Sequence, residues 1–248
     1  MHNKCTLIIP VAGLGTRLNS SGPKNLFNVS GRSILNWIID QVPKEICELI
    51  LVTSNSHLLT YQDEIEKQYL KKIPSILIKT QPKAQGTLSA VKIGLNASSN
   101  DMNLVIWGDQ IGITRALLTS LISNKDESST IVLPLIYKKN PYVYFTLDNI
   151  GNILSFVETK ESNLNIFGGL TDSGTFLVSQ SKMQKGFNCL LEHEKLEIEL
   201  KGECNFLSTF KILEQNGFLI KKLIHYDLSS TQAINSIEDV TNFTSNHL

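Results

Sequence analysis

The sequence predicts an α/β fold built on a doubly wound, mostly parallel mixed sheet. Short runs of consecutive apolar residues alternate with helical patterns through the first half of the chain. Strands that are apolar at successive positions are typical of parallel sheets covered by helices on both faces. In the second half, several β-rich runs follow one another across short turns, and this order predicts that the sheet is mixed.

The elements of the first half alternate in type. We expect strands at residues 6–11, 48–54, 75–79 and 103–109, and helices at 33–42, 59–70, 87–97 and 114–124. The first of these helices has apolar residues at positions 34, 35, 38, 39 and 42, which is the spacing of one helix face. Right-handed crossovers between such strands give a doubly wound sheet.

The second half is richer in strands. We expect strands at residues 129–137, 142–148, 151–158, 173–179 and 218–226, and helices at about 180–193 and 205–216. Asn149, Gly151 and Asn152 mark a tight turn between two of these strands. There is no internal repeat, low-complexity tract or long linker, so we expect a single domain over residues 1–248.

Composition excludes several classes of protein. The chain has 248 residues, of which 42% are hydrophobic and 19% charged, and its formal net charge is zero. A neutral chain has no overall field to attract nucleic acid or an anionic membrane, and no apolar run is long enough to span a bilayer. The four cysteines are far apart in the sequence, which favours reduced thiols over disulfides or zinc. We therefore expect a cytoplasmic protein that binds neither nucleic acid nor membranes.

The stretch "VAGLGTRLNSSGPK", residues 11–24, follows the first expected strand and contains three glycines, two cations and no acid. Ligands of open parallel sheets bind past the carboxyl ends of the strands. Glycines there let successive backbone N–H groups form a nest for phosphate oxygens, and Arg17 and Lys24 add positive charge. A plain surface loop would need the glycines but not the cations. The loop therefore predicts an anion site.

Two well-known phosphate loops do not fit this stretch. No Lys-Ser or Lys-Thr pair follows the glycines as in a P-loop, and the last glycine of the dinucleotide fingerprint is replaced by Leu18. The pattern G-x-G-T-R, with Lys24 seven residues after Arg17, resembles instead the signature of the nucleotidyltransferases that activate phosphorylated sugars and alcohols. That family has G-x-G-x-R-[ML], a variable stretch and then P-K.

The resemblance implies a Rossmann-like, GT-A-type nucleotidyltransferase fold and a loop that wraps a triphosphate. Arg17 would hold the departing pyrophosphate, and Lys24 would stabilise charge at the α-phosphate. The other loop residues that would surround the nucleotide are Ala12, Gly13, Gly15 and Thr16. The same resemblance divides the chain into a nucleotide-binding half at about 1–125 and an acceptor-binding half at about 126–248.

Later segments follow the order of the family's motifs. Asp109 ends the run "NLVIWGD" and matches the aspartate that binds magnesium in the family. Asn235 in "AINSIEDV" matches the second metal ligand of an "x-[ND]-T-P-E-D-[LV]" segment, although Ser236 and Ile237 replace Thr-Pro. Ser236 is equally well placed to cap a helix, with Asp239 just inside it. The resemblance implies Mg²⁺ as the cofactor.

The segment "QPKAQGTLSAV", residues 81–91, resembles the family's "Q-x(4)-G-T" motif. Gln81 would contact the base, Gly86 would allow close approach, and Thr87 would cap the following helix while touching the nucleotide. In uridylyltransferases of this type the matching glutamine contacts uracil, so the resemblance favours UTP or CTP over a purine triphosphate.

The resemblance is weaker on the acceptor side. The candidate acceptor residues are Glu158, Lys160, Asp172 and Glu203. Glu158 and Lys160 match positions that meet a sugar hydroxyl and the acceptor phosphate. However, the glycine that approaches the sugar is missing near Tyr144, and Asp172 stands where the family has asparagine. Glu203 lies in "GECNFL", at the expected start of a late helix, where a first-turn glutamate is also favoured by the helix dipole.

Together these features predict a magnesium-dependent nucleotidyltransferase. It would join a pyrimidine nucleoside triphosphate to a phosphorylated acceptor, most simply a sugar 1-phosphate, and release pyrophosphate. A non-sugar phosphate such as phosphocholine remains an alternative acceptor. A glycosyltransferase of related fold would usually carry D-x-D where this chain has Gly108-Asp109-Gln110. A non-catalytic nucleotide-binding regulator is the third possibility, and the oligomeric state is open.

Overall fold

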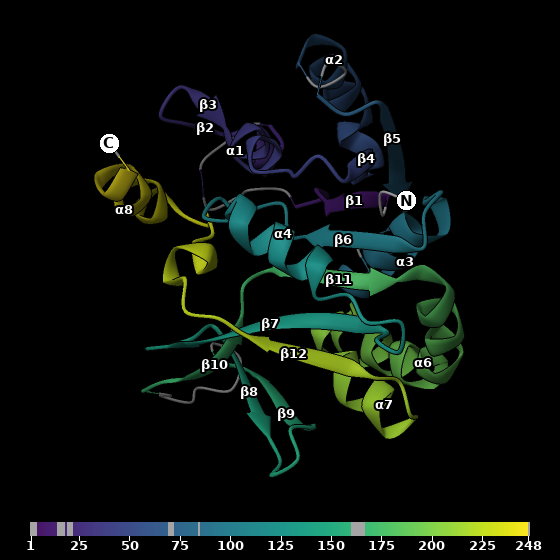
Figure 1. The fold of residues 1–248 in the computed structure, drawn as a ribbon. Helices are drawn as coiled ribbons and strands as arrows, with labels where there is room; N and C mark the ends of the chain where they lie inside the picture. Colours follow the sequence, from purple (N-terminus) through teal and green to yellow (C-terminus); the bar gives the residue numbers. More distant parts are fainter. Residues whose placement is uncertain are drawn as a thin grey trace.

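A computed structural model describes residues 4–13, 18, 22–68, 72–83, 85–159 and 167–247. Figure 1 shows a single mixed sheet that runs through the molecule with helices on both of its faces. Within the described residues, nine strands of the sheet follow the order β5-β4-β1-β6-β11-β7-β10-β8-β9, and the tenth, β12, pairs with β7. The predicted α/β fold with a mostly parallel mixed sheet is confirmed.

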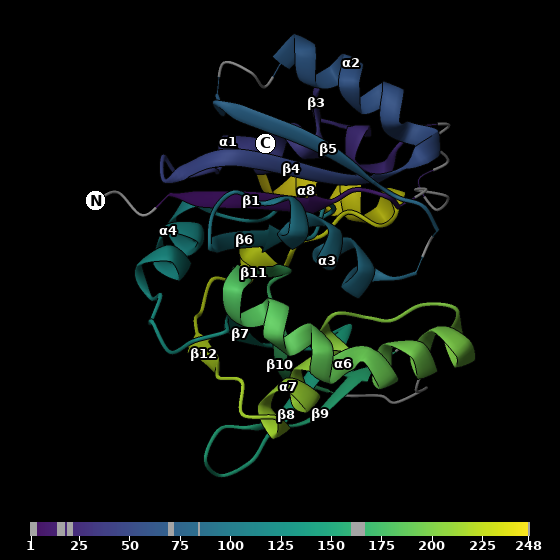
Figure 2. The same cartoon turned by 90° about the vertical axis from the view of Figure 1, so that its right-hand side faces the viewer.

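The first half of the chain forms the parallel part of the sheet. Its strands are β1 (Cys5–Pro10), β4 (Ile46–Ser54), β5 (Ser75–Gln81) and β6 (Met102–Ile106). β1 lies between β4 and β6 and is parallel to both. Successive residues of β1 enter opposite cores, because Leu7 and Ile9 pack on one face of the sheet and Ile8 on the other. All four strands end at the same edge of the sheet, as Figures 1 and 2 show.

The second half adds the antiparallel part. Its strands are β7 (Ile131–Lys138), β8 (Val143–Leu147), β9 (Ile153–Glu158), β10 (Gly169–Asp172), β11 (Thr175–Ser179) and β12 (Ile220–Ile224). β10 and β11 both pair antiparallel with β7 and are separated only by Ser173 and Gly174, whose φ is 66°. They form one strand that bends at this point. The bend lies beside β6, since the Trp107 N–H donates to the Gly174 carbonyl at 2.8 Å.

Helices cover both faces of the sheet. They are α1 (Ile34–Asp40), α2 (Leu58–Gln68), α3 (Thr87–Ala97), α4 (Arg115–Ser123), α6 (Gln180–Lys201), α7 (Phe210–Gln215) and α8 (Ile237–His247). The core on one face includes residues of α1, α2, α4 and α8. The core on the other face includes residues of α3, α6 and α7. Helices on both faces are the arrangement that a doubly wound sheet requires.

The structure differs from the sequence prediction at three places. α6 runs to Lys201 rather than to about residue 193, because in its last two turns Leu196, Ile198 and Leu200 alternate with charged residues and do not show helical spacing. A Lys201–Glu197 ion pair at 2.9 Å lies in this part of the helix. The strand β10 was not predicted. A small hairpin, β2 (Asn28–Val29) with β3 (Arg32–Ser33), was also missed, and its turn places Ser30 and Gly31 at positive φ.

In the part of the chain that the structure describes, no helix is both long enough and apolar enough to cross a membrane.

Candidate functional site

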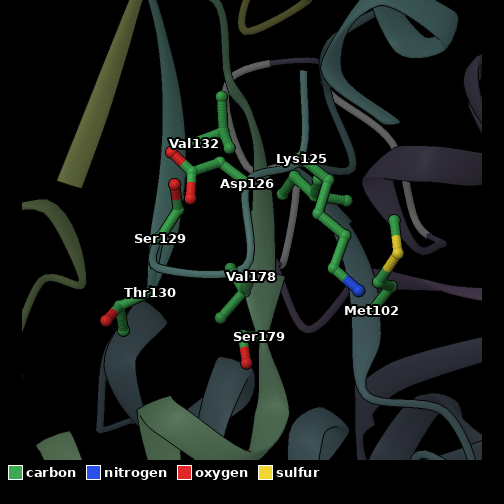
Figure 3. A pocket seen from close by; sticks show the side chains of 9 residues that line it. Met102, Lys125, Asp126, Ser129, Thr130, Val132, Val178 and Ser179 are labelled. Carbon is green, nitrogen blue, oxygen red and sulfur yellow. The ribbon is translucent and has the colours of Figure 1, made fainter. Parts of the chain in front are cut away.

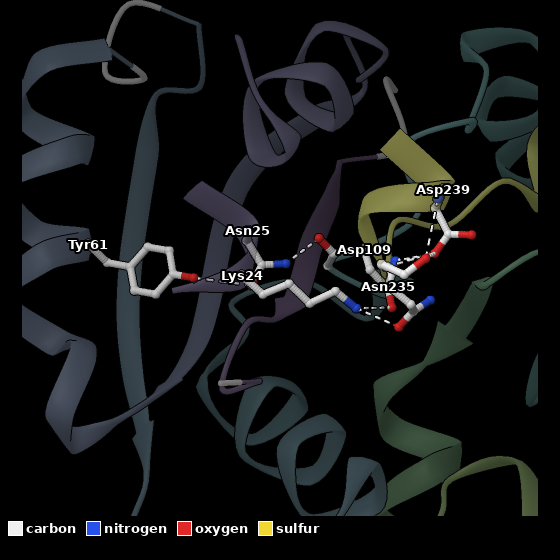
Figure 4. Close-up of polar contacts among 8 residues, drawn as sticks. Lys24, Asn25, Tyr61, Asp109, Asn235 and Asp239 are labelled. Atoms are coloured by element: carbon white, nitrogen blue, oxygen red, sulfur yellow. Dashed lines mark hydrogen bonds and ion pairs between the residues drawn. The ribbon is translucent and has the colours of Figure 1, made fainter. Parts of the chain in front are cut away.

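Lys24 and the two predicted metal ligands meet at the carboxyl edge of the parallel strands. Lys24 begins a short 3-10 helix, η2 (Lys24–Leu26), in the segment that follows β1. Asp109 lies in the loop after β6, three residues beyond its last residue, Ile106. Asn235 immediately precedes the cap of α8. Figure 4 shows the three side chains pointing toward one another from these separate elements.

The Lys24 ammonium occupies the centre of this group. Its Nζ donates to Asp109 Oδ2 at 2.7 Å and to Asn235 Oδ1 at 2.7 Å. The Lys24 and Asp109 side chains are 14% and 25% exposed, so the ion pair is largely buried but still in partial contact with solvent. Two oxygens from distant segments therefore converge on one position that carries positive charge.

A second set of contacts fixes the neighbours of Lys24 and Asp109. The side chain of Asn25 donates to the carbonyl of Gly108. The segment that carries Lys24 is therefore bonded to the loop after β6 at two neighbouring positions. The hydroxyl of Tyr61 on α2 lies 3.2 Å from Asn25 Oδ1. Asn25 and Tyr61 are both buried, which makes this network part of the scaffold rather than of the open site.

The segment that carries Asn235 is bound to the Asp109 loop by its backbone. The Ile234 N–H donates to the Asp109 carbonyl at 2.9 Å, and the Gly112 N–H donates to the Gln232 carbonyl at 3.0 Å. A side chain on Gly112 would overlap the Ser229 carbonyl, so only glycine allows the two segments to approach this closely. The two predicted metal ligands are thus held in register by main-chain bonds.

Asn235 is also fixed from the side of α8. Asp239 Oδ2 accepts hydrogen bonds from the N–H groups of Asn235 and Ser236, each at 2.8 Å. Ser236 Oγ accepts in return from the Asp239 N–H at 3.3 Å. This reciprocal arrangement is a capping box with aspartate at its third helical position. The expected cap by Ser236 is confirmed, and it coexists with the candidate role of the neighbouring Asn235.

The donor set suits magnesium. A carboxylate oxygen and an amide oxygen are hard ligands, and Mg²⁺ in proteins is usually held by one or two such groups together with substrate phosphates and water. The Lys24 ammonium already shows that a cation is stabilised between Asp109 and Asn235. Among the residues that the structure describes, there is no cluster of three or more His, Cys, Asp or Glu side chains that would form an all-protein metal site.

Asp172, a predicted acceptor residue, lies close to this centre. It ends β10 just before the bend, and its Oδ2 accepts from the Gly174 N–H at 2.8 Å. Burial raises the pKa of the Asp172 carboxyl to about 6, and the nearby negative charge of Asp109 acts in the same direction. The structure thus places two carboxylates near one another where only one is paired with Lys24.

A second group of predicted residues gathers around Asn205. Glu158 at the end of β9 accepts a hydrogen bond from Asn205 Nδ2. Thr87 at the start of α3 donates through its hydroxyl to Asn205 Oδ1 at 3.3 Å. The sequence prediction did not single out Asn205. No local pattern marks it, because its partners lie in segments far away along the chain.

The predicted base-binding residues also lie together. Gln81 Nε2 donates to the Gly86 carbonyl at 3.1 Å, which orders the turn between β5 and α3. Gly86, not Thr87, is the N-cap of α3, so the prediction that Thr87 caps this helix is wrong. The Thr87 hydroxyl instead accepts from the Phe206 N–H at 2.8 Å. The close approach at Gly86 is made by the backbone of Cys204.

The remaining candidates are less informative. Glu203 is exposed and follows Gly202, the C-cap of α6, rather than beginning a helix, so that part of the prediction is wrong. Ala12 and Gly13 follow β1, and the position of a side chain on Gly13 would be open space. Four predicted residues lie outside the described residues: Gly15, Thr16, Arg17 and Lys160.

The structure adds one cation that the sequence prediction missed. Lys138 is the last residue of β7, and its side chain makes no hydrogen bond or ion pair with the described residues. Burial lowers the pKa of its ammonium, while the charges of Asp172 and Asp239 oppose that shift. Its position at the end of a strand could have identified it. β7 and β6 are both antiparallel to β11, so β7 runs in the same direction as β6 and ends at the same edge of the sheet.

A small cavity elsewhere is not a substrate site. It lies near Met102, Ser129 and Ser179, at the opposite edge of the sheet, and Figure 3 shows the side chains that line it. Its volume of about 10 Å³ is at the lower limit for one water molecule. Ser129 Oγ is buried there without a hydrogen-bond partner among the described residues, so a single water fits both the space and the chemistry.

Comparison with known proteins supports the same interpretation. The family model described as "MobA-like NTP transferase domain" matches residues 7–156. The bifunctional protein GlmU of Vesicomyosocius okutanii is 30% identical over 189 residues, which is 75% of this chain and 40% of that protein. The chain therefore spans less than half the length of that curated relative.

Solved structures share the fold at low sequence identity. The inositol-1-phosphate CTP transferase of T. maritima has a TM-score of 0.73 at 15% identity, with 98% of this chain and 96% of that chain covered. A putative glucose-1-phosphate thymidylyltransferase from Bacillus anthracis has a TM-score of 0.71 at 17% identity, with the same coverage. A family match over more than half of the chain, a GlmU relative and this shared fold agree with the converging Lys24, Asp109 and Asn235. The chain belongs to the MobA-like NTP transferase domain family, a family of nucleotidyltransferase enzymes.

Proposed function

We propose that this protein is a magnesium-dependent nucleotidyltransferase that joins a pyrimidine nucleoside triphosphate to a phosphorylated small molecule. An oxygen of the acceptor phosphate attacks the α-phosphorus, the bond from that phosphorus to the β-phosphate bridging oxygen breaks, and pyrophosphate leaves with the electron pair. The acceptor phosphate is already ionised at neutral pH, so no general base is required. The observation that carries this proposal is the Lys24 ammonium held between Asp109 and Asn235.

Each residue has a role that follows from its position. Asp109 and Asn235 would hold Mg²⁺, which when bound neutralises phosphate charge and orients the triphosphate. Lys24 lies at the same place and would stabilise the charge that develops on the α-phosphate oxygens. Arg17 would hold the departing pyrophosphate from the preceding loop. Such transfers depend on positioning and electrostatics more than on covalent chemistry by the protein.

We assign the two halves of the chain to the two substrates. Residues of about 1–125 would bind the nucleotide through the loop after β1 and through Gln81, Gly86 and Thr87. Residues of about 126–248 would bind the acceptor through Glu158, Asp172 and Lys160. The bonds of Asn205 to Thr87 and Glu158 support a substrate site shared by both halves.

We also propose which nucleotide and which class of acceptor the enzyme uses. A pyrimidine nucleotide is favoured by the glutamine motif at Gln81, and two fold neighbours are named as a CTP transferase and a thymidylyltransferase. For the acceptor, a sugar 1-phosphate is the first candidate. A non-sugar phosphate is the second, because Asp172 stands where the family has asparagine, and a carboxylate would pair with amines as well as hydroxyls.

A pyrophosphate-release screen tests the proposal. Four nucleoside triphosphates are crossed with sugar 1-phosphates, inositol 1-phosphate, phosphocholine and amino-acid phosphates in the presence of Mg²⁺. We expect turnover with UTP or CTP and one acceptor class. Lys24→Ala and Asp109→Ala should each lower that turnover by about two to three orders of magnitude while the protein stays folded.

The control is Glu127→Gln, an exposed side chain in the turn before β7, far from the carboxyl edge. It should keep wild-type turnover. Nucleotide binding without pyrophosphate release from any pair would contradict the proposed reaction and favour a regulator. Near wild-type turnover of both the Lys24 and the Asp109 variant would contradict the proposed site.

A further inference from the structure

The turn between α6 and α7 carries a side chain that connects the two proposed substrate sites. Asn205 lies in this turn, between the buried residues Cys204 and Phe206. Its amide nitrogen donates to Oε1 of Glu158 at the end of β9. Its amide oxygen accepts from the Leu207 N–H at 3.0 Å and from the Thr87 hydroxyl at 3.3 Å. One side chain thus links the end of β9 and the start of α3 to its own turn.

The orientation of this amide is fixed by its partners. A backbone N–H such as that of Leu207 can only donate, and an ionised carboxylate such as that of Glu158 can only accept. The amide oxygen must therefore face Leu207, and the amide nitrogen must face Glu158. Asparagine supplies a donor and an acceptor at this spacing, whereas aspartate would supply acceptors only and would set a second negative charge against Glu158.

The turn that carries Asn205 is itself clamped to the start of α3. The Leu88 N–H donates to the Cys204 carbonyl at 3.1 Å, and the Cys204 N–H donates to the Gln85 carbonyl at 3.0 Å. The Phe206 N–H donates to the Thr87 hydroxyl at 2.8 Å. Asn205 is therefore held in place by the same segment that is proposed to bind the base.

We propose that Asn205 is a positioning residue for the acceptor: it holds the Glu158 carboxylate in the orientation that binds the acceptor, from a turn that is fastened to the base-binding segment. This inference rests on the proposed function. It also locates the contribution of the "GECNFL" segment at Asn205 rather than at Glu203. The Glu203 side chain is exposed and makes no hydrogen bond or ion pair with the described residues.

The kinetic test uses Asn205→Asp, which has nearly the same shape and keeps the acceptor for Leu207 and Thr87 but loses the donor to Glu158. The substrates are the triphosphate and acceptor that give the highest turnover in the screen above. We expect KM for the acceptor to rise at least tenfold, while KM for the triphosphate changes less than threefold. The matched control is Asn149→Asp, the same change in the exposed turn between β8 and β9, where both KM values should stay at wild-type levels.

A second measurement needs no turnover. In Asn205→Asp combined with Glu158→Gln, the new amide at position 158 can donate to the new carboxylate at position 205, so the bond is restored with its roles exchanged. We expect Asn205→Asp alone to lower the urea midpoint of unfolding and the double variant to recover most of that loss. This recovery reports the contact itself, independently of any substrate.

Additive effects of the two substitutions on the midpoint would overturn the proposal, because the contact would then contribute nothing. So would an equal rise in both KM values, which indicates a general structural role, or an unchanged acceptor KM. Silence of the wild-type protein in the whole screen is a different result. It contradicts the proposed function and removes the acceptor role with it, even if the midpoints show that the bond exists.

Discussion

The Nζ atom of Lys24 lies 2.7 Å from Oδ2 of Asp109, although 85 positions separate the two residues in the chain. The same Nζ lies 2.7 Å from Asn235 Oδ1, so in this structure the lysine occupies the position between the two proposed metal ligands. An ammonium and a divalent cation cannot share that position, because like charges repel and because Asp109 Oδ2 and Asn235 Oδ1 both point toward the same place. Metal binding must therefore displace Lys24, toward the phosphates that it is proposed to bind.

This displacement predicts that Lys24→Met tightens metal binding in the absence of nucleotide. Methionine keeps much of the length of the side chain without its charge, so Asp109 and Asn235 become free to bind Mn²⁺, used here as a spectroscopic substitute for Mg²⁺. We expect the Kd for Mn²⁺, measured by electron paramagnetic resonance, to fall about 5- to 150-fold, the usual range of coupling between two sites. Turnover should fall at the same time.

The control for this prediction is Lys72→Met. Lys72 also pairs with an aspartate, Asp40, but on a different surface, so its loss should leave Mn²⁺ affinity unchanged. If Lys24→Met bound Mn²⁺ no more tightly than the wild-type protein, the lysine would not be competing for the metal position.

Asp172 predicts a pH-dependent cost to stability. Burial, together with the negative charge of Asp109, raises the pKa of its carboxyl in the folded protein from the ordinary 3.8 to about 6. For a carboxyl with a raised pKa, the stabilising contribution is fully present below the unfolded pKa and is lost as the pH rises through the folded pKa. Asp172→Asn keeps an acceptor for the Gly174 N–H and should be more stable than wild type by up to about 3 kcal/mol above pH 7.

The measurement is urea unfolding of both proteins between pH 4 and pH 8. The difference in free energy of unfolding should be near zero at the acid end and should grow mainly between pH 4 and pH 6. A difference that stays constant across this range would show that the ionisation of Asp172 is not its origin.

The meeting of Lys24 and Asp109 at one edge of the sheet could be predicted from the sequence, whereas the side-chain network around Asn205 could not. Lys24 and Asp109 each follow a buried parallel strand, and the ends of such strands meet at one edge of a sheet. Asn205 follows no comparable rule. Its partners Glu158 and Thr87 lie 47 and 118 positions away, and only the folded chain brings them together.

The missed elements have equally local reasons. β10 is only four residues long, begins with Gly169, where a side chain would overlap the Tyr144 ring, and has Thr171 as its single β-branched residue, so the run gives little strand signal. In the last two turns of α6, Leu196, Ile198 and Leu200 alternate with charged residues, so helical periodicity gives no signal there. Their hydrogen bonds and the Lys201–Glu197 pair maintain the helix as far as Gly202.

The capping box before α8 predicts a link between helix stability and metal affinity. Asp239 accepts from the N–H groups of Asn235 and Ser236, so Asp239→Ala removes the cap and releases the backbone of a proposed metal ligand. We expect a loss of about 1 kcal/mol in stability, typical of a lost cap, together with weaker Mn²⁺ binding. Glu238→Ala is the control, because it changes the adjacent acid of the same helix turn without touching the cap. Equal effects of the two variants on Mn²⁺ binding would contradict the link.

Gly86 predicts a packing penalty that can be separated from its backbone strain. Its φ is 87°, and a Cβ would overlap the carbonyl of Cys204, which accepts a hydrogen bond from the Leu88 N–H. Gly151 has a nearly identical φ of 90°, but no atom lies within 4 Å of the position that a Cβ would take there. Gly151→Ala should therefore show the cost of positive φ alone, about 1–3 kcal/mol.

Gly86→Ala should destabilise the protein clearly more than Gly151→Ala, because it also separates the start of α3 from the turn that carries Asn205. Urea unfolding of both variants measures the two costs, and equal losses would mean that the contact with Cys204 does not contribute to stability. A raised acceptor KM in any folded Gly86→Ala protein would follow from the same separation, since Asn205 would no longer be held where it bonds to Glu158.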